Sequence, residues 1–481
     1  MKKIVLFLIL SVFTFSTLTL AAAKVEEDIF FKESLLKKMP GKATHLFTAA
    51  DFRNQFLNVS PQLNVLFTPE FTEQTFAKIQ KIYQLEIKTA RLGISSDKEM
   101  VDFLQQSGLL KELGISNSRA LATFKKMDTE GRALKPRADY AKYHTLDAPQ
   151  TPVVFPGEFE PVGAVYISWP IYDTFAWDRS AELVKEIKTA APAWIFVPNV
   201  FWQKAAQLYL TKKDVTLDNI KFLHIPTNDV WARNWGQMTV LSGKNRSPVF
   251  ISAPLVNPAA GQPFAKGSFN ANVAFGQYMD VPVYELPLVL EQGGNILTDG
   301  NGTIITSKYI YHQNPDVAPQ RFKKIFKDYY GAEQVIVIPN APGEVCGHVD
   351  IYVKFADPQT VFVASAPKDS LWYESVEKMA KTIADSKSLA GKKYKVVRLP
   401  VPSNQILGKD SKDWSYINSL TVNKKVIVPL YGAPEDQQAL KIYKETLPDH
   451  EVVGVDFHPY FFGAIHCQTQ NVLPVVTKER F

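Results

Sequence analysis

Short β-rich runs alternate with helical segments over the C-terminal part of this chain, and this alternation constrains the fold more than any other feature. The β-rich runs lie at 163–169, 194–198, 237–241, 281–290, 303–306, 334–338, 348–355, 360–364, 394–399, 425–430 and 451–456. Apolar residues three and four apart predict helices at 181–190, 201–212, 319–330, 371–387 and 434–446. Strands that alternate with helices in this way indicate a mixed α/β domain with many short strands.

A proline-rich segment at 135–156 separates this part from a polar, helical N-terminal part. Its prolines are Pro136, Pro149, Pro152 and Pro156. Proline is unfavourable inside helices and strands, so we place the domain boundary in this segment. We expect a small helical N-terminal region at 24–150 and an α/β domain at 151–481. With 46% hydrophobic and 21% charged residues, the chain has the composition of a folded globular protein.

The first residues have the pattern of a secretory signal peptide. Met1-Lys2-Lys3 is followed by an apolar run at 4–18 and by three alanines at 21–23. We expect residues 1–23 to be a signal peptide that is cleaved before Lys24, and the protein to be secreted or periplasmic. The apolar run is short for a spanning helix, so we expect no stable membrane insertion after cleavage. The formal net charge of +6 comes without a dense basic block, so we expect no nucleic-acid partner.

Cys467 and His348 are the residues that point most clearly to chemistry. A cysteine attacks as the thiolate, so it needs a base that removes its proton or a charge that lowers its pKa, and His348 can supply both. If 348–355 is an extended strand, the side chains of His348 and Asp350 point to the same side. The sequence therefore predicts Cys467, His348 and Asp350 as catalytic residues.

The same residues allow two further interpretations. Two cysteines are too few for a disulfide framework in an exported chain of this length, but Cys346 and Cys467 could form a disulfide under oxidation. Thiolate, imidazole and carboxylate are also zinc ligands, and these types are present in Cys346, His348, Asp350, His466 and Cys467. The Cys-x-His-x-Asp spacing is unusual for zinc, so we expect neither a metal nor an organic cofactor.

Five blocks of the sequence together resemble the agmatine deiminase and bacterial-type peptidylarginine deiminase family of guanidino-group-modifying enzymes. In order, they are 160–170 (EPVGAVYISWP), 228–234 (NDVWARN), 293–300 (GGNILTDG), 347–350 (GHVD) and 465–467 (IHC). The resemblance covers nearly all of the predicted second domain. It implies a five-bladed α/β propeller, the pentein fold, in which ββαβ units surround a central pocket. The N-terminal helical region lies outside it.

The resemblance implies a hydrolase that releases ammonia from the guanidino group of agmatine, arginine or peptidylarginine. Cys467 would attack the guanidinium carbon and form a covalent thiouronium. His348 would protonate the departing ammonia and then activate the water that hydrolyses the intermediate. Asp350 would hold the guanidinium. The expected partner is therefore a small-molecule or peptide guanidino substrate.

The resemblance also implies substrate contacts by four residues, Trp231, Asn234, Asn295 and Asp229. Trp231 would lie against the planar or aliphatic part of the substrate, with a place in the core as the alternative. Asn295 would orient groups near the pocket, unless its role in the Gly-Gly-Asn turn is structural. The alternative role for Asp229 is to cap its loop. Arg233, in the same sequence block, is expected to form a structural ion pair.

Asn234 departs from the family pattern, because the family's Trp-x-Arg-Asp has a second guanidinium-binding Asp at this position. A charge-assisted hydrogen bond contributes about 1.5–3 kcal/mol and a neutral one about 1 kcal/mol, so we expect roughly tenfold or greater weakening of substrate binding. The chain is then a slower deiminase, an enzyme for another guanidino or ureido substrate, or an inactive guanidinium-binding protein. The stretch 462–464 (FGA) also differs from the Gly-Gly-Asn before Ile-His-Cys in agmatine deiminases, which argues against assuming agmatine as the substrate.

Overall fold

The computed structural model describes most of the chain from His144 onward. The described residues are 144–145, 147–170, 176–197, 203, 206–207, 209–211, 213–225, 227, 230–253, 255–257, 262–264, 266–288, 292–314, 317–341, 347–402, 414–457 and 463–477. The predicted signal peptide and almost all of the predicted helical region lie outside these residues, as do Asp229 and Cys346. Among the described helices, none combines the length and the apolarity needed to cross a bilayer.

Four sheets share one strand order, in which the first strand is antiparallel to the second and the second is parallel to the third. A helix connects the two parallel strands of each sheet. The strands are β6 (Met238–Ser242), β7 (Ser247–Ser252) and β10 (Val283–Glu285); β11 (Leu297–Thr298), β12 (Thr303–Ser307) and β13 (Gln334–Ile338); β14 (Val353–Phe355), β15 (Thr360–Ser365) and β16 (Lys395–Pro400); β17 (Leu420–Val422), β18 (Lys425–Leu430) and β19 (Glu451–Asp456). The connecting helices are α12 (Lys266–Met279), α15 (Pro319–Tyr330), α16 (Tyr373–Asp385) and α17 (Asp436–Thr446).

A fifth sheet repeats this order with strands from both ends of the described chain. Its first strand is β20 (Thr469–Val472), which pairs antiparallel with β3 (Ala164–Ser168). β3 is parallel to β4 (Ala193–Val197), which follows α9 (Trp177–Lys188), and β4 is parallel to β5 (Ile220–His224). This pairing joins the C-terminal strand to the first sheet and brings the segment after Cys467 beside the start of the domain.

The remaining elements extend this plan. β1 (His144–Thr145) and β2 (Val153–Val154) add to the two edges of the sheet of β6, β7 and β10. β8 (Leu255–Asn257) and β9 (Gln262–Phe264) form a separate hairpin, while α14 (Tyr309–Gln313) follows β12 and α19 (Pro474–Thr477) follows β20. The pairing of β1 places residues 144–145, which belong to the proline-rich segment at 135–156, in a sheet of the α/β domain.

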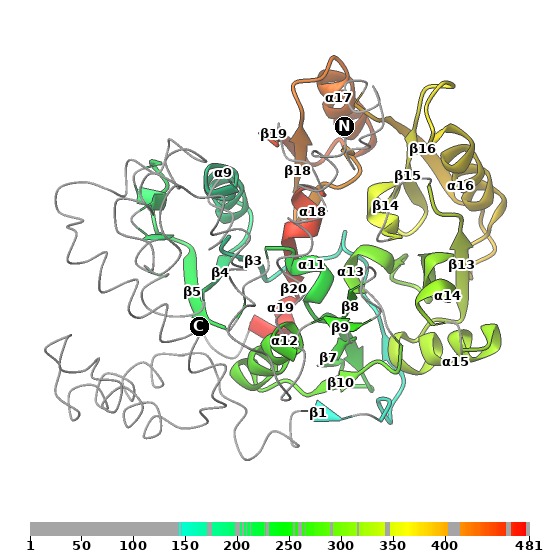
Figure 1. Ribbon diagram of the computed structural model, residues 1–481, viewed down its shortest axis with the longest axis horizontal. Helices are drawn as coiled ribbons and strands as arrows, with labels where there is room; N and C mark the ends of the chain where they lie inside the picture. Colours follow the sequence, from blue (N-terminus) through cyan, green and yellow to red (C-terminus); the bar gives the residue numbers. More distant parts are fainter. Residues whose placement is uncertain are drawn as a thin grey trace, which may run out of the picture.

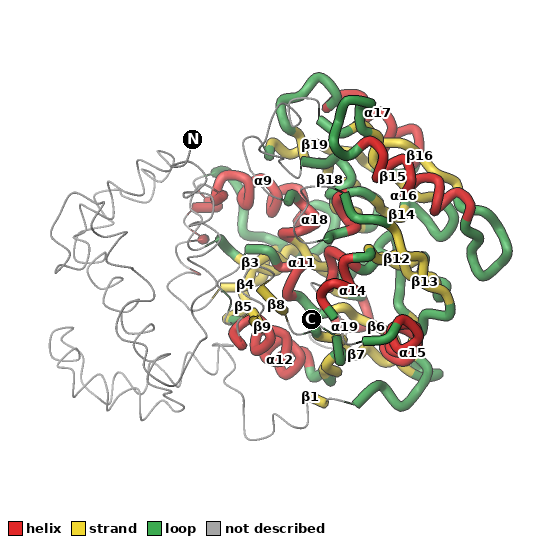
Figure 2. The backbone as a smooth tube through the Cα atoms, turned by 45° about the vertical axis from the view of Figure 1, so that its right-hand side comes forward, coloured by secondary structure: helices red, strands yellow, loops and turns green. Residues whose placement is uncertain are grey.

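Helix α15 shows how local sequence produces the repeated unit. Pro319 occupies its first turn, where no backbone N–H is needed, and Gly331 ends it with a left-handed φ of 68°. Its apolar residues at three and four apart all face the core: Phe322, Ile325, Phe326, Tyr329 and Tyr330. Figures 1 and 2 show α15, α16 and α17 along the outer side of their sheets.

Short helical turns precede the first strand of most sheets and lie near the middle of the molecule (Figure 1). They are α11 (Ala232–Trp235) before β6, α13 (Gln292–Asn295) before β11, η3 (Val349–Ile351) before β14 and α18 (Ile465–Gln468) before β20. α11 contacts α13 and α18, and α13 contacts η3. The short helical turns that precede the first strands of these sheets thus contact one another at the centre.

The predicted mixed α/β class is confirmed, and the repeated sheets are consistent with the five-unit propeller that the resemblance implies. The strand predicted at 348–355 is wrong in its first half, because Val349–Ile351 form the 3-10 helix η3 and the strand β14 covers Val353–Phe355 alone. The predicted strand at 281–290 is shorter, at Val283–Glu285. Helix α12 was not predicted, since its glycines, asparagines and scattered apolar residues give little helical periodicity.

Candidate active site

The central turns bring Cys467, His348 and Asp350 together. Cys467 lies on α18, Asp350 lies in η3, and His348 directly precedes η3. The thiol sulfur, a ring nitrogen of His348 and a carboxylate oxygen of Asp350 all lie within 4.8 Å of one another, and all three residues are buried. Cys467 Sγ is 3.7 Å from Asp350 Oδ2. The structure therefore groups the three predicted catalytic residues, although 117 positions separate Asp350 from Cys467.

His348 and Asp350 converge by a route that differs from the predicted strand. His348 has extended backbone angles, with φ −72° and ψ 122°, and the chain then turns into η3. The imidazole packs directly over Gly294 of α13, where a Cβ would lie 2.7 Å from the ring. The two glycines of the Gly-Gly-Asn turn thus permit close approach, since Gly293 similarly lies against Arg233.

Asn418 holds Cys467 in place, although no motif in the sequence pointed to this residue. Its Nδ2 donates to Cys467 Sγ at 3.2 Å, and its Oδ1 accepts from the backbone N–H groups of Cys467 at 3.2 Å and Ala464 at 3.0 Å. Asn418 lies two residues before the first strand of its own unit, as Asn295 and Cys467 lie two residues before theirs. That shared position is the sequence signal, and it becomes readable only once the strands of each unit are aligned.

The surroundings of Cys467 favour the protonated thiol while no substrate is bound. Burial raises the pKa of the Cys467 thiol, and the negative charge of Asp350 raises it further, while the hydrogen bond and charge of His348 oppose the shift. The thiol therefore requires an additional positive charge beside Asp350, or proton transfer to His348, before it can attack.

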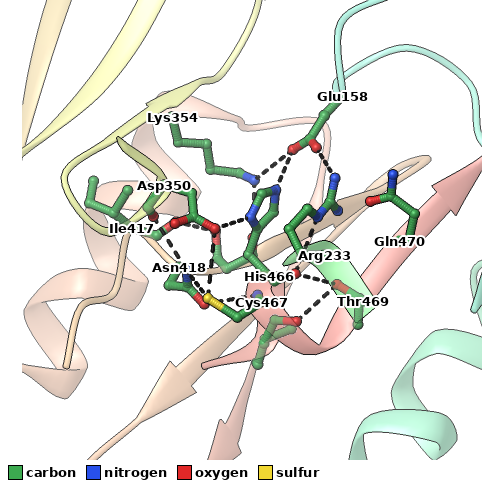
Figure 3. A network of polar contacts seen from close by, with 12 residues as sticks. Glu158, Arg233, Asp350, Lys354, Ile417, Asn418, His466, Cys467, Thr469 and Gln470 are labelled. Carbon is green, nitrogen blue, oxygen red and sulfur yellow. Dashed lines mark hydrogen bonds and ion pairs between the residues drawn. The ribbon is translucent and has the colours of Figure 1, made fainter. Parts of the chain in front are cut away.

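A network of polar contacts extends from Asp350 through His466 to Glu158, Arg233 and Lys354 (Figure 3). His466 Nδ1 lies 2.6 Å from Asp350 Oδ2, and His466 Nε2 lies 2.7 Å from Glu158 Oε2. Glu158 also forms an ion pair with Arg233, as expected of Arg233 from the sequence, and Lys354 Nζ is 4.0 Å from Glu158. Burial by itself raises the pKa of Glu158, but Arg233 and His466 hold that pKa well below its usual range.

The predicted substrate-binding residues differ in their surroundings. Trp231 lies beside the thiol, because a Cβ on Gly463 would be 2.9 Å from Trp231 Cζ3 and 3.0 Å from Cys467 Sγ. Asn234 Oδ1 is buried and, like Asp350 Oδ1, has no hydrogen-bond partner among the described residues. Asn295 Oδ1 accepts from the backbone N–H of Ser307 at 3.0 Å, which supports its structural role, while its Nδ2 is buried without a described partner.

The zinc interpretation retains only part of its predicted ligand set. His348, Asp350 and Cys467 present one atom each within 4.8 Å. Both ring nitrogens of His466 are instead occupied by carboxylates, and Cys346 lies outside the described residues. Three donors remain for a metal, and these are also the three groups that thiol chemistry requires.

Comparisons with known proteins agree with this fold. The agmatine deiminase of Pseudomonas aeruginosa (strain LESB58) is 25% identical over 356 residues, which cover 66% of this chain and 94% of that protein. The agmatine deiminase structure of Enterococcus faecalis matches with a TM-score of 0.58 and 22% identity, over 71% of this chain and 99% of that one. A cysteine-to-serine variant of the C. jejuni enzyme with substrate bound matches with a TM-score of 0.58 and 20% identity, over 66% and 96%.

The family model that matches is that of the Porphyromonas-type peptidyl-arginine deiminase, over residues 154–473. This match covers all five sequence blocks of the predicted resemblance and every residue of the buried Cys-His-Asp group. It confirms the predicted family, and with it the prediction of a cysteine-dependent deiminase that acts on a guanidino group. With its repeated sheets and its central cysteine, this chain belongs to the Porphyromonas-type peptidyl-arginine deiminase family.

Proposed function

We propose that this protein is an exported hydrolase that converts a guanidino group to a ureido group and ammonia through a thiouronium on Cys467. The observation that carries the proposal is the convergence of the Cys467 thiol, the His348 imidazole and the Asp350 carboxylate within 4.8 Å. These are the nucleophile, the acid/base group and the anion that guanidinium chemistry needs. Agmatine, free arginine and peptidylarginine are the candidate substrates.

Substrate binding uses acceptor atoms that the described protein leaves unpaired. Asp350 Oδ1 and Asn234 Oδ1 are buried acceptors without a described partner, and a guanidinium has only donors to offer them. An unpaired buried acceptor costs about 1–3 kcal/mol, so a planar cation that fills these positions is stabilised. Trp231, beside the thiol, provides a flat apolar face for the rest of the substrate.

The bound cation also activates the nucleophile. Burial and the charge of Asp350 raise the pKa of the Cys467 thiol, so a guanidinium that pairs with Asp350 removes the second of these causes. The thiol proton passes to His348, and Sγ forms a bond to the guanidinium carbon. A C–N bond then breaks, and its nitrogen leaves as ammonia with the proton from His348.

The second half of the reaction restores the enzyme. His348, now neutral, removes a proton from water, and the hydroxide adds to the thiouronium carbon. The C–S bond breaks, the ureido product forms, and the thiol regains its proton. The sum is one guanidino group and one water converted to one ureido group and one ammonia.

Turnover on a panel of agmatine, free arginine and arginyl peptides tests the proposal. We expect ammonia release with at least one of them under reducing conditions, and a mass increase on Cys467 that corresponds to the thiouronium. Cys467→Ala should abolish both while the protein stays folded, whereas Cys346→Ala serves as the matched thiol control. Absence of turnover with retained ligand binding would favour the guanidinium-binding alternative that Asn234 suggests.

Two further measurements concern export and metal. Cell fractionation with N-terminal sequencing of the mature protein should place it outside the cytoplasm and find Lys24 as its first residue. Stoichiometric zinc that a chelator removes together with activity would overturn the thiol mechanism, because the same three atoms would then be metal ligands.

A further inference from the structure

His466 is held between two carboxylates by both of its ring nitrogens (Figure 3). We propose that Glu158 and His466 are positioning residues for the deiminase reaction: His466 stays doubly protonated between Glu158 and Asp350, and holds Asp350 with Oδ1 available to the substrate. The inference rests on the proposed role of Asp350 as the group that holds the guanidinium. Neither Glu158 nor His466 needs to touch the substrate for this role.

Hydrogen-bond geometry determines the protonation of the His466 ring. Ionised carboxylates only accept hydrogen bonds, and a neutral imidazole has one donor nitrogen and one acceptor nitrogen. The two distances, 2.6 Å from Nδ1 to Asp350 and 2.7 Å from Nε2 to Glu158, both require an N–H. An acceptor nitrogen at either position would face a carboxylate oxygen, so the ring carries both protons and a positive charge.

The contact with His466 orients Asp350. Its Oδ2 faces His466 Nδ1, while its Oδ1 is buried without a described partner. A carboxylate held at one oxygen loses rotation about its Cβ–Cγ bond, so the position of the other oxygen is also defined. His466 is adjacent to Cys467 on α18, so the same contact links the carboxylate to the helix that carries the nucleophile.

Glu158 balances the charges on the far side of the ring. It forms an ion pair with Arg233, contacts His466 and lies 4.0 Å from Lys354 Nζ. Burial lowers the pKa of Lys354 to about 8, so this group too carries charge at neutral pH. Without the Glu158 carboxylate, Asp350 would be the remaining carboxylate among the described residues of this cluster, which disfavours a positive charge on His466.

The first test reads the His466 ring directly and is independent of turnover. In the full chain labelled with nitrogen-15 in its histidine rings, the His466 signals are identified by their loss in His466→Gln. We expect both ring nitrogens to carry protons at pH 7 in the unaltered protein, because each faces a carboxylate. In Glu158→Gln, where Nε2 no longer faces a charged acceptor, one of the two protons should be lost at the same pH. A neutral His466 ring at pH 7 in the unaltered protein would overturn the proposal, as would a ring with both protons in Glu158→Gln.

The second test separates positioning from folding. We expect Glu158→Gln to lower kcat/KM by about tenfold or more, mainly through KM, with the new ionisation of His466 visible in its pH profile. Glu158→Asp, which retains the charge, should recover part of the loss. The control is Glu186→Gln. The Glu186 carboxylate is 24% exposed, against 21% for Glu158, and it forms a 2.6 Å ion pair with Lys425 that does not involve the Cys-His-Asp group.

The outcomes distinguish this inference from the proposed function. If Glu158→Gln only reduces the folded fraction and matches Glu186→Gln in kcat and KM, the positioning role is wrong. If the unaltered protein releases no ammonia but shows the doubly protonated His466 ring, the proposed deiminase activity is wrong, while the positioning of Asp350 by Glu158 and His466 stands. In that case the KM comparison is replaced by the Kd of a guanidinium ligand, which Glu158→Gln should weaken by the same factor.

Discussion

Residue 234 is the place where this chain differs most consequentially from the family pattern. Its Oδ1 is buried without a hydrogen-bond partner among the described residues, in the turn α11 that contacts both α13 and α18. In the proposed site, an aspartate here would offer the substrate a full charge, whereas the asparagine offers only a neutral acceptor. We therefore expect residue 234 to set how strongly the site binds a cation.

Asn234→Asp is expected to raise kcat/KM on the best guanidino substrate by about tenfold, because a neutral acceptor becomes a charged one. Steady-state kinetics across the substrate panel measures the effect. Asn234→Ala, which removes the acceptor altogether, should lower kcat/KM below that of the unaltered protein. If both variants leave the kinetics unchanged, the side chain does not face the substrate and the pocket differs from that of the family.

At the scale of elements, the turns that precede the sheets position the side chains of the proposed active site by close packing. The Gly-Gly-Asn turn of α13 supports the His348 ring through Gly294 and the Arg233 side chain through Gly293. Asn418, before β17, fixes the backbone of α18 through two accepted hydrogen bonds. His348 and Cys467, two of the predicted catalytic residues, are thus each positioned by a neighbouring unit rather than by their own.

Gly294→Ala should move the His348 ring, because the added Cβ would lie 2.7 Å from it. A displacement of about 1 Å at a catalytic group costs about a hundredfold in rate, so we expect kcat to fall by that order. The comparison variant is Gly454→Ala on β19, whose Cβ would instead press on Leu430, away from the Cys-His-Asp group. Gly454→Ala should lower stability but leave kcat and KM per folded molecule unchanged; equal kinetic losses in both would contradict this account.

The described α/β domain is closed by a strand pairing between its first and last parts. β20 pairs with β3, so the strand that follows the nucleophile completes the sheet that begins the domain. Val472 of β20 is fully buried, at 0% exposure, in the hydrophobic cluster that also contains Tyr166, Trp194 and Phe275, whereas Val475 is 37% exposed. Stability of the entire domain and placement of Cys467 therefore depend on the same contact.

Val472→Asp is expected to destabilise the whole domain by several kcal/mol, because an unpaired carboxylate is buried. Urea unfolding followed by tryptophan fluorescence should show a single transition at a lower midpoint, with loss of activity along the same curve. Val475→Asp, three residues later, should unfold like the unaltered protein. Two separate transitions in Val472→Asp would show that the closing sheet unfolds independently of the others.

Individual helices and the predicted site residues can be identified from the sequence. The spacing of Phe322, Ile325 and Phe326 with Pro319 and Gly331 defines α15, because amphipathic spacing and helix ends are decided within a few residues. The family motifs identified Cys467, His348 and Asp350, which the structure brings together, and their catalytic roles stay predictions until the variants are measured. Cys346, Asp229 and the N-terminal region lie outside the described residues, so the predictions about them also stand untested.

The tertiary structure determines contacts between distant residues, which no local sequence pattern predicts. Residues 349–351 alternate like a strand but form η3, because the turn carries Asp350 to Cys467 and His466. Glu158 reaches His466 across 308 positions, and Asn418 reaches Cys467 across 49. Such contacts join residues from different sheets, so the local sequence specifies each turn and strand, and the packing of the sheets determines which polar groups meet.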